Sequence, residues 1–148
     1  MRLDELMRFA SRFFDEEGAD YYLFGAAAMN FWISPRMTAD LDVILCVDKR
    51  RARSLLKKLQ VHRFPITTKR TRSLLAGQMI KLSLEKSELD LKLAEDDHEL
   101  EALSRSKVFT AEDFKLRIAV PEDLVLFKLQ SWRLQDQADV ERLWKTRR

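Results

Sequence analysis

The sequence predicts an α/β or α+β domain in which a small mixed sheet carries flanking helices on at least one face. Segments with helical spacing of apolar residues and short apolar or alternating segments follow one another as helix, strand, helix, strand, helix, strand pair and helices. The chain has 148 residues, of which 46% are hydrophobic and 34% charged, without a visible repeat or linker. We therefore expect residues 1–148 to form one domain with a sizeable core.

The N-terminal half predicts alternating helices and strands with local boundary signals. The first apolar pattern ends at Gly18, which suits a helix C-cap, and Asp48 is placed to cap a later helix at its N-terminus. The expected elements are a helix starting near Leu3, a strand Tyr21–Phe24, a helix Ala26–Ile33 ended by Ser34 and Pro35, a strand Ala39–Val47 and a helix Lys49–Gln60.

The C-terminal half predicts a strand pair followed by helices. Apolar residues alternate in Met79–Leu84 and Glu88–Leu93, and the three residues 85–87 between them indicate a hairpin. The other expected elements are a short helix Asp96–Ser104, a hairpin or extended pair in Val108–Ala119, a helix from Pro121 to about Leu134 and a helix Asp136–Trp144. The segment 61–78 shows no readable pattern.

The composition excludes several classes of protein. A single cysteine rules out an internal disulfide, and one cysteine with two histidines is too few for a usual structural zinc site. No apolar run approaches the roughly 18 residues of a membrane span, and acids interrupt the N-terminal apolar residues, unlike a secretory signal. We therefore expect a cytoplasmic protein with no membrane partner, and the sequence does not indicate its oligomeric state.

The charged residues are unevenly distributed, although the net charge is only +3. Ten basic residues and no acid lie between Lys49 and Arg72, whereas acids predominate between Glu85 and Glu101. Such asymmetry suggests an anionic partner at the basic region. The competing interpretation is a solvated helix face, which a run of charges taken alone favours.

Asp40 and Asp42 are the most informative residues of the chain. They lie two apart on an otherwise apolar strand, so both side chains share a face and their Cα atoms are about 6.6 Å apart. Acids in such a strand are costly unless they are paired or bind metal, and this spacing suits one or two hard cations such as Mg²⁺. The alternative is a strand end at which both acids face solvent or pair with Arg36.

The segment around these acids resembles the nucleotidyltransferase superfamily. Members have a strand ending in Gly-Gly or Gly-Ser, a helix, and then Asp-x-Asp on the next strand, followed later by a third acid between apolar residues. Here Gly25 precedes the helix, Arg36-x-Thr38-x-Asp40-x-Asp42 follows it, and Leu89-Asp90-Leu91 matches the third acid. The resemblance implies the nucleotidyltransferase fold for most of the chain.

One branch of that superfamily is the most similar, namely the AbiEii-type abortive-infection toxins and small related proteins. The later segment Pro121–Lys128, followed by Arg133, Asp136 and Asp139, also resembles this branch. The resemblance therefore extends from about Tyr21 to Trp144. It also suggests a role in a toxin–antitoxin system.

The resemblance implies a role for each matching residue. Asp40, Asp42 and Asp90 would hold Mg²⁺, with Mn²⁺ as the alternative, at a nucleoside triphosphate, and Asp90 would also suit a base toward the acceptor hydroxyl. Glu88 shares the face of Asp90 and is the competing candidate. The implied nucleotide-binding residues are Gly25, Ala26, Arg36, Thr38 and Lys128.

Several of these residues have ordinary alternatives. Gly25 allows close approach to phosphate but equally suits a plain strand-to-helix turn, and Ala26 stands where the superfamily usually has Gly or Ser. Arg36 matches phosphate geometry but would also pair with an acid. Lys128 either reaches a phosphate or extends its ammonium to the surface of a mostly apolar helix.

Other conspicuous residues are expected to be structural. We expect His62 and His98 at the surface and Cys46 buried in a strand. Trp32, Trp132 and Trp144 are expected in the core. Asp136 is expected to cap a helix, and Asp139 to be an acid of its first turn.

Two functions remain open at this point. The first is a Mg²⁺-dependent enzyme that transfers a nucleoside monophosphate from a triphosphate to RNA, a protein or a small molecule. The second is an inactive module of the same fold that binds a nucleotide, a nucleic acid or a protein partner. The intact set of three acids favours the enzyme, whereas Ala26 and the small size of the chain favour the module.

Overall fold

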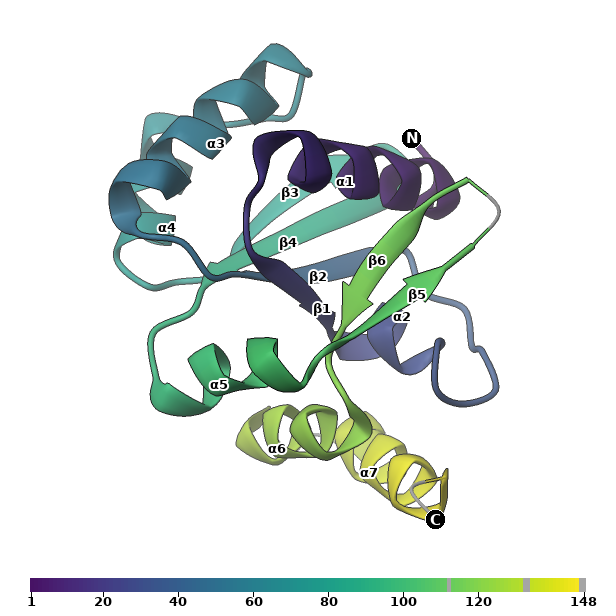
Figure 1. Ribbon diagram of the computed structural model, residues 1–148. Coiled ribbons are helices and arrows are strands. Elements are labelled where there is room, and N and C mark those ends of the chain that lie inside the picture. The colour runs from purple at the N-terminus through teal and green to yellow at the C-terminus, as the bar shows by residue number, and fades with distance from the viewer. Residues whose placement is uncertain (112, 132–133, 147–148) are drawn as a thin grey trace.

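The computed structural model describes residues 1–111, 113–131 and 134–146, and its centre is a six-stranded sheet in the order β3-β4-β2-β1-β6-β5 (Figure 1). The strands are β1 Tyr21–Phe24, β2 Asp40–Leu45, β3 Ile80–Leu84, β4 Ser87–Leu93, β5 Lys107–Thr110 and β6 Lys115–Ile118. The sheet is mixed, because β2 runs parallel to β4 and β1 runs parallel to β6, while the other neighbours are antiparallel. This confirms the predicted fold class.

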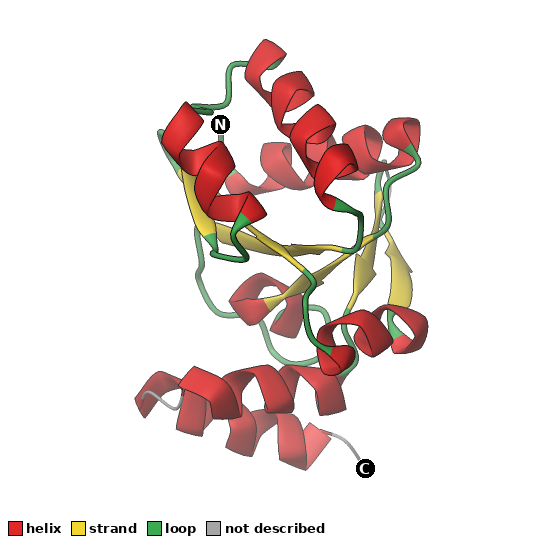
Figure 2. Cartoon of the chain, turned by 90° about the vertical axis from the view of Figure 1, so that its left-hand side faces the viewer, coloured by secondary structure: helices red, strands yellow, loops and turns green. Residues whose placement is uncertain are grey.

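Helices lie on both sides of the sheet, as Figure 2 shows from the side. One layer contains α1 Leu3–Glu17, α3 Lys49–Val61 and α4 Thr68–Leu75, and the other side carries α2 Gly25–Met29, α5 Asp97–Arg105, α6 Pro121–Ser131 and α7 Leu134–Thr146. No helix within the described ranges combines the length and the apolar character that crossing a bilayer requires.

Local sequence signals account for most helix boundaries. Gly18 ends α1 in the left-handed conformation with φ 61°, as its position predicts. Asp48 caps α3 by accepting a hydrogen bond from the Arg51 N–H, and Asp96 caps α5 in the same way from the Glu99 N–H. These caps satisfy backbone groups that the first helical turn leaves without a partner.

The structure corrects several predicted boundaries. The helix predicted for Ala26–Ile33 is the five-residue α2, because Asn30 bonds through its side chain to both the N–H and the carbonyl of Arg36 and so stabilises a loop instead. The unreadable segment 61–78 contains α4, which Thr67 caps. The last helix begins at Leu134 rather than Asp136.

The alternation of β2 decides where the acids lie. Leu41, Val43 and Leu45 are at most 1% exposed, in the core shared with α1 and α3. Asp40 and Asp42 therefore point to the opposite face, where α2 and α6 lie. That face carries the candidate site.

Candidate active site

Four carboxylates from two adjacent strands meet on this face of the sheet. The parallel register pairs Asp40 with Glu88 and Asp42 with Asp90, and residues that pair in register carry their side chains on the same face. Asp40, Asp42 and Asp90 line a cavity of about 620 Å³ that also includes residues of α2, β3 and α6. The structure therefore brings the three sequence-predicted acids together.

The carboxylates are close enough to share a cation. Oxygen atoms of Asp40, Glu88 and Asp90 all lie within 4.8 Å of one another. Asp42 interacts directly with Asp90, and burial together with the charges of Asp90 and Asp40 raises the pKa of Asp42 to about 7. In the absence of a cation, Asp42 thus keeps its proton up to a pH of about 7.

Asp90 is the most buried of the four acids, with 2% of its surface exposed. Lys81, opposite it on β3, donates a hydrogen bond from Nζ to Oδ2 at 2.9 Å, and this bond raises the pKa of the lysine. The second oxygen, Oδ1, is buried without a hydrogen-bond donor among the described residues. Lys81 therefore neutralises one oxygen of Asp90 and leaves the other without a donor among the described residues.

Gly25 is required by the position of Asp42. The residue has φ 74°, and a Cβ at this position would lie 2.8 Å from Cγ of Asp42 and overlap its carboxylate. The close packing brings the backbone of the β1–α2 turn against the acids, with Ala26 also lining the cavity. Because α2 has only five residues, its dipole adds little to anion binding.

Two predicted cations, Arg36 and Lys128, are held by a buried acid of α7. Asp139 is fully buried, and its Oδ2 lies 3.1 Å from both Lys128 Nζ and Arg36 Nη2. Lys128 Nζ also lies 3.3 Å from Asp136 Oδ1. Both cations line the cavity of the acids, so Lys128 does not extend to the surface, and Arg36 pairs with Asp139 rather than with Asp40 or Asp42.

Thr38 lies at the entrance to β2, and its Oγ1 accepts a hydrogen bond from the Asp40 N–H at 3.3 Å. The side chain also lines the cavity. Thr38 therefore helps to orient the start of the acid-bearing strand, in addition to any contact with a ligand.

Known structures share this architecture. No protein-family model and no curated protein matches the sequence. A lincosamide antibiotic adenylyltransferase with bound lincomycin superposes with a TM-score of 0.68 at 15% identity over 99% of both chains. A nucleotidyltransferase-like protein from Paracoccidioides brasiliensis superposes with a TM-score of 0.60 at 16% identity, and the match covers 96% of this chain and 75% of that one. The antibiotic-resistance factor ANT(2'')-Ia superposes with a TM-score of 0.55 at 11% identity, and the match covers 99% of this chain and 85% of that one.

This chain has the nucleotidyltransferase fold. The similarity confirms the fold that the sequence resemblance implies, whereas membership of the superfamily and of its AbiEii-type branch remains a prediction.

The acid cluster of this nucleotidyltransferase fold fits a divalent cation. Its four carboxylates provide hard oxygen ligands of the kind that Mg²⁺ prefers, and the buried Oδ1 of Asp90 needs a positive partner. Lys81 is the only cation that forms an ion pair with these acids in the described part of the chain. Asp40, Glu88 and Asp90 have the mutual spacing of a metal site, and Asp42, which interacts with Asp90, would complete the set of residues that hold such an ion.

Some residues of this fold behave differently from the sequence interpretation. Asp136 lies inside α7 and Asp139 beyond its first turn, and both are buried against Lys128 rather than acting as a cap and a first-turn acid. Trp144 is 59% exposed and thus not a core residue. His98 is half-buried, 3.1 Å from Asp123. Sequence position alone does not show these long-range partners.

The expectations for the remaining structural residues have mixed outcomes. His62 is exposed, as predicted, and its ring packs edge-on against Phe9. Trp32 packs against the core and donates its indole N–H to the carbonyl of Ala119. Cys46 is half-buried at the end of β2, and Trp132 lies outside the described residues.

Sequence reasoning missed Lys81. It alternates with Ile80 and Leu82, which indicates that it faces away from the apolar side of the strand. The predicted three-residue turn would have placed Lys81 opposite Leu91. The observed two-residue turn, with Glu85 at φ 66°, places it opposite Asp90 instead.

Proposed function

We propose that this chain is a Mg²⁺-dependent nucleotidyltransferase that transfers a nucleoside monophosphate from a triphosphate to an acceptor hydroxyl and releases pyrophosphate. The observation that carries the proposal is the convergence of Asp40, Asp42 and Asp90 on one cavity beside the close-packed Gly25 turn. The similarity to adenylyltransferase structures supports this class of reaction for the fold.

The acids of the cavity have complementary roles in this proposal. The divalent ion, when bound, neutralises charge on the triphosphate and on the leaving pyrophosphate. Asp40, Asp42 and Asp90 hold that ion, because their carboxylates supply the negative charge that it requires. Asp90 accepts the proton of the acceptor hydroxyl, since its buried Oδ1 has no protein donor among the described residues.

The cations of the cavity bind the triphosphate. Arg36 and Lys128 line the cavity on the side of α6 and α7, and their shared partner Asp139 holds both in position. A guanidinium matches phosphate geometry, and an ammonium acts as a point charge. The acceptor oxygen forms a bond to the α-phosphorus as the bond from that phosphorus to the bridging oxygen breaks, and the pyrophosphate leaves with the electron pair.

A binding module of the same fold is the second candidate, and the Lys81–Asp90 ion pair favours it. An ammonium that already neutralises Asp90 reduces the need for a cation at that carboxylate. In that case the chain would bind a nucleotide, a nucleic acid or a protein partner without transferring anything, as in a component of a toxin–antitoxin system. Lys81 is 60% exposed, so the ammonium can move away when a divalent ion arrives.

Transfer of label tests the proposal directly. The protein is incubated with each of the four triphosphates labelled at the α-phosphorus, with Mg²⁺ and with total RNA, a cell lysate or pooled small hydroxyl compounds. We expect a labelled product from one or more of these acceptors and none after chelation of the metal. Absence of any labelled product, together with intact triphosphate binding, would favour the binding module.

Single substitutions test the role of each acid in binding the metal. Asp42→Asn and Asp40→Asn should each lower transfer by about a thousandfold, corresponding to about 4 kcal/mol, and should remove Mg²⁺-dependent triphosphate binding in calorimetry. Asp20→Asn and Asp97→Asn are matched controls, because both acids are exposed and remote from the cavity. Equal triphosphate binding by Asp42→Asn and the wild type would contradict the metal role.

A further inference from the structure

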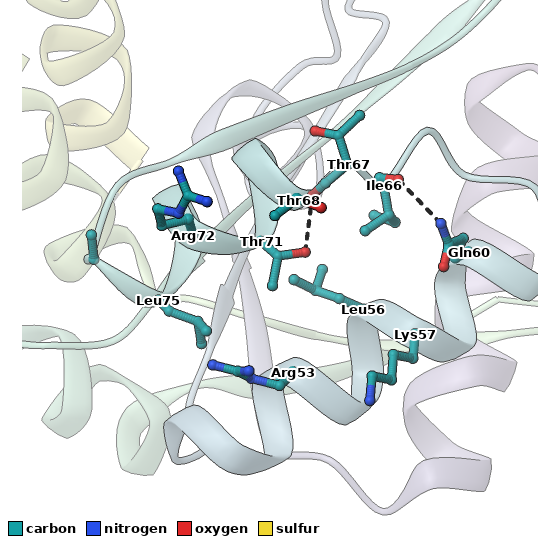
Figure 3. Close-up of a pocket in the computed structure, with 11 residues that line it drawn as sticks. Arg53, Leu56, Lys57, Gln60, Ile66, Thr67, Thr68, Thr71, Arg72 and Leu75 are labelled. Carbon is teal, nitrogen blue, oxygen red and sulfur yellow. Dashed lines mark hydrogen bonds between the residues drawn. The ribbon is translucent and has the colours of Figure 1, made fainter.

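A second cavity lies on the other side of the sheet, between α3 and α4, with a volume of about 600 Å³ (Figure 3). Leu56, Ile66 and Leu75 form the apolar part of its lining, which we call the floor. Figure 3 shows Leu56 extending from α3 into the space between the two helices. We refer to this cavity as the α3–α4 groove.

Basic side chains surround the groove. Arg53 and Lys57 are one helical turn apart on α3 and share a face, while Arg72 lines the groove from α4. No acid lines the groove in the described part of the chain, and these three exposed cations form no ion pair with any described residue. Of the other basic residues in 49–72, Arg51 and Lys58 are both paired with Glu17, away from the groove.

Hydroxyl and amide groups complete the lining. Thr67 and Thr68 lie at the start of α4, and Thr71 follows one turn later with its hydroxyl donating to the Thr67 carbonyl. Gln60 donates its side-chain amide to the carbonyl of Ile66. The groove thus combines an apolar floor, several polar groups and a basic rim.

We infer that the α3–α4 groove binds single-stranded nucleic acid. Phosphates would contact Arg53, Lys57 and Arg72 at the rim, and a base would lie against the apolar floor with its edge near the threonine hydroxyls. A duplex offers its phosphates but keeps its bases stacked inside, so it cannot use the floor. An acidic peptide would satisfy the cations but has no flat apolar group for the floor at each charge.

The groove lies close to the acid cavity along the chain. Ala76 lines the groove and Met79 lines the acid cavity, and three residues span at most roughly 11 Å. This connection leads into the edge strand β3, which no further strand covers in the described sheet. A strand of nucleic acid in the groove can therefore continue around this edge toward Asp90. If the chain is the proposed nucleotidyltransferase, single-stranded nucleic acid is then its acceptor.

Fluorescence anisotropy tests binding without nucleotide or Mg²⁺, so its result is independent of transfer. The probe is a labelled 12-nucleotide single-stranded RNA of mixed sequence, compared with DNA of the same sequence and with the RNA duplex. We expect single strands to bind more tightly than the duplex, and the affinity to fall about twentyfold between 50 and 200 mM salt for three phosphate contacts. Tighter binding of the duplex would overturn the inference.

A triple variant locates the site. Arg53→Gln, Lys57→Gln and Arg72→Gln together should weaken single-strand binding at least tenfold at 50 mM salt and lower the salt slope by about 2. The matched control is Arg12→Gln, Lys86→Gln and Lys107→Gln, which removes the same charge from exposed positions outside the groove. If both triple variants weakened RNA binding equally, net charge alone would explain the binding, and the groove would not be the binding site.

Crosslinking tests the path around β3. A photoreactive residue at Thr68 should crosslink to the RNA, as should one at Met79, whereas one at the exposed Ser104 should not. Crosslinking at Ser104 alone would refute the groove. Competition by polyglutamate as strong as that by RNA of equal charge would overturn the nucleic-acid assignment in favour of an acidic protein partner.

Discussion

Lys81 Nζ lies 2.9 Å from Oδ2 of Asp90, so an ammonium occupies one oxygen of the most buried acid in the site. The pair forms because β3 and β4 place the two residues directly opposite each other. This ammonium lies where a divalent ion would otherwise neutralise the acids. The site therefore holds a positive charge of its own in the absence of metal.

Replacing that charge should strengthen metal binding. In Lys81→Met, Mg²⁺ no longer competes with the ammonium, so we expect at least fivefold tighter Mg²⁺ binding in calorimetry. The metal-free variant should lose about 1–3 kcal/mol in the free energy of unfolding, because Asp90 loses its hydrogen-bond donor. Lys86→Met in the adjacent turn is the control. Unchanged or weaker Mg²⁺ binding by Lys81→Met would contradict the competition.

Stability without metal should fall as the pH rises from about 4 to about 7. Burial and the charge of Asp90 raise the pKa of Asp42 to about 7 from its ordinary value of 3.8. The folded state therefore binds a proton that the unfolded state has lost in this window, and ionisation of Asp42 destabilises the fold. At about 1.4 kcal/mol per pKa unit, the loss is as much as about 4 kcal/mol.

Urea unfolding at several pH values measures this effect as the difference between the wild type and Asp42→Asn. The variant should gain stability relative to the wild type as the pH rises through the window, and saturating Mg²⁺ should remove most of the pH dependence of the wild type. A constant difference between the two proteins from pH 4 to pH 8 would refute the raised pKa.

Gly25→Ala should disrupt both the fold and the site. Gly25 has a positive φ, and its new methyl group would overlap the Asp42 carboxylate. We expect a loss of about 2–4 kcal/mol in the free energy of unfolding and loss of triphosphate binding. Gly18→Ala separates the two causes, because Gly18 also has a positive φ but nothing lies within 4 Å of the added Cβ. It should cost only about 1 kcal/mol.

The Gly25 prediction has a clear opposite outcome. If Gly25→Ala loses no more stability than Gly18→Ala and binds triphosphate normally, the close approach of the turn to Asp42 is not needed.

Asp139→Asn should weaken triphosphate binding through Arg36 and Lys128. The acid is fully buried and contacts both cations, so the substitution leaves two partly buried charges without its carboxylate. We expect a rise of at least tenfold in the apparent KM for triphosphate, with a smaller change in kcat, and a stability loss of about 3 kcal/mol. Steady-state kinetics and urea unfolding measure the two effects.

Glu141→Gln is the control for Asp139→Asn, because Glu141 pairs with Lys145 on the exposed side of α7. Asp139→Glu should restore part of the affinity if the negative charge is what holds the cations. A decrease in stability with an unchanged KM would assign Asp139 to the packing of α7 alone.

The sequence by itself determined the fold class, most helices and strands, and the face that the first two acids share. Alternation of side chains along β2 is a local property, so the positions of Asp40 and Asp42 relative to Leu41 follow from their spacing. Helix caps such as Asp48 are equally local, because donor and acceptor lie three residues apart.

Only the tertiary structure decided which charges meet. Asp139 contacts Arg36 across 103 residues, and a shift of one residue in the β3–β4 turn determines whether Lys81 faces Asp90 or Leu91. Short-range periodicity carries no information about such pairs, since it is the same whichever distant element packs against a given face. The partners are selected by strand order, register and the docking of α6 and α7, which depend on the packing of the whole core.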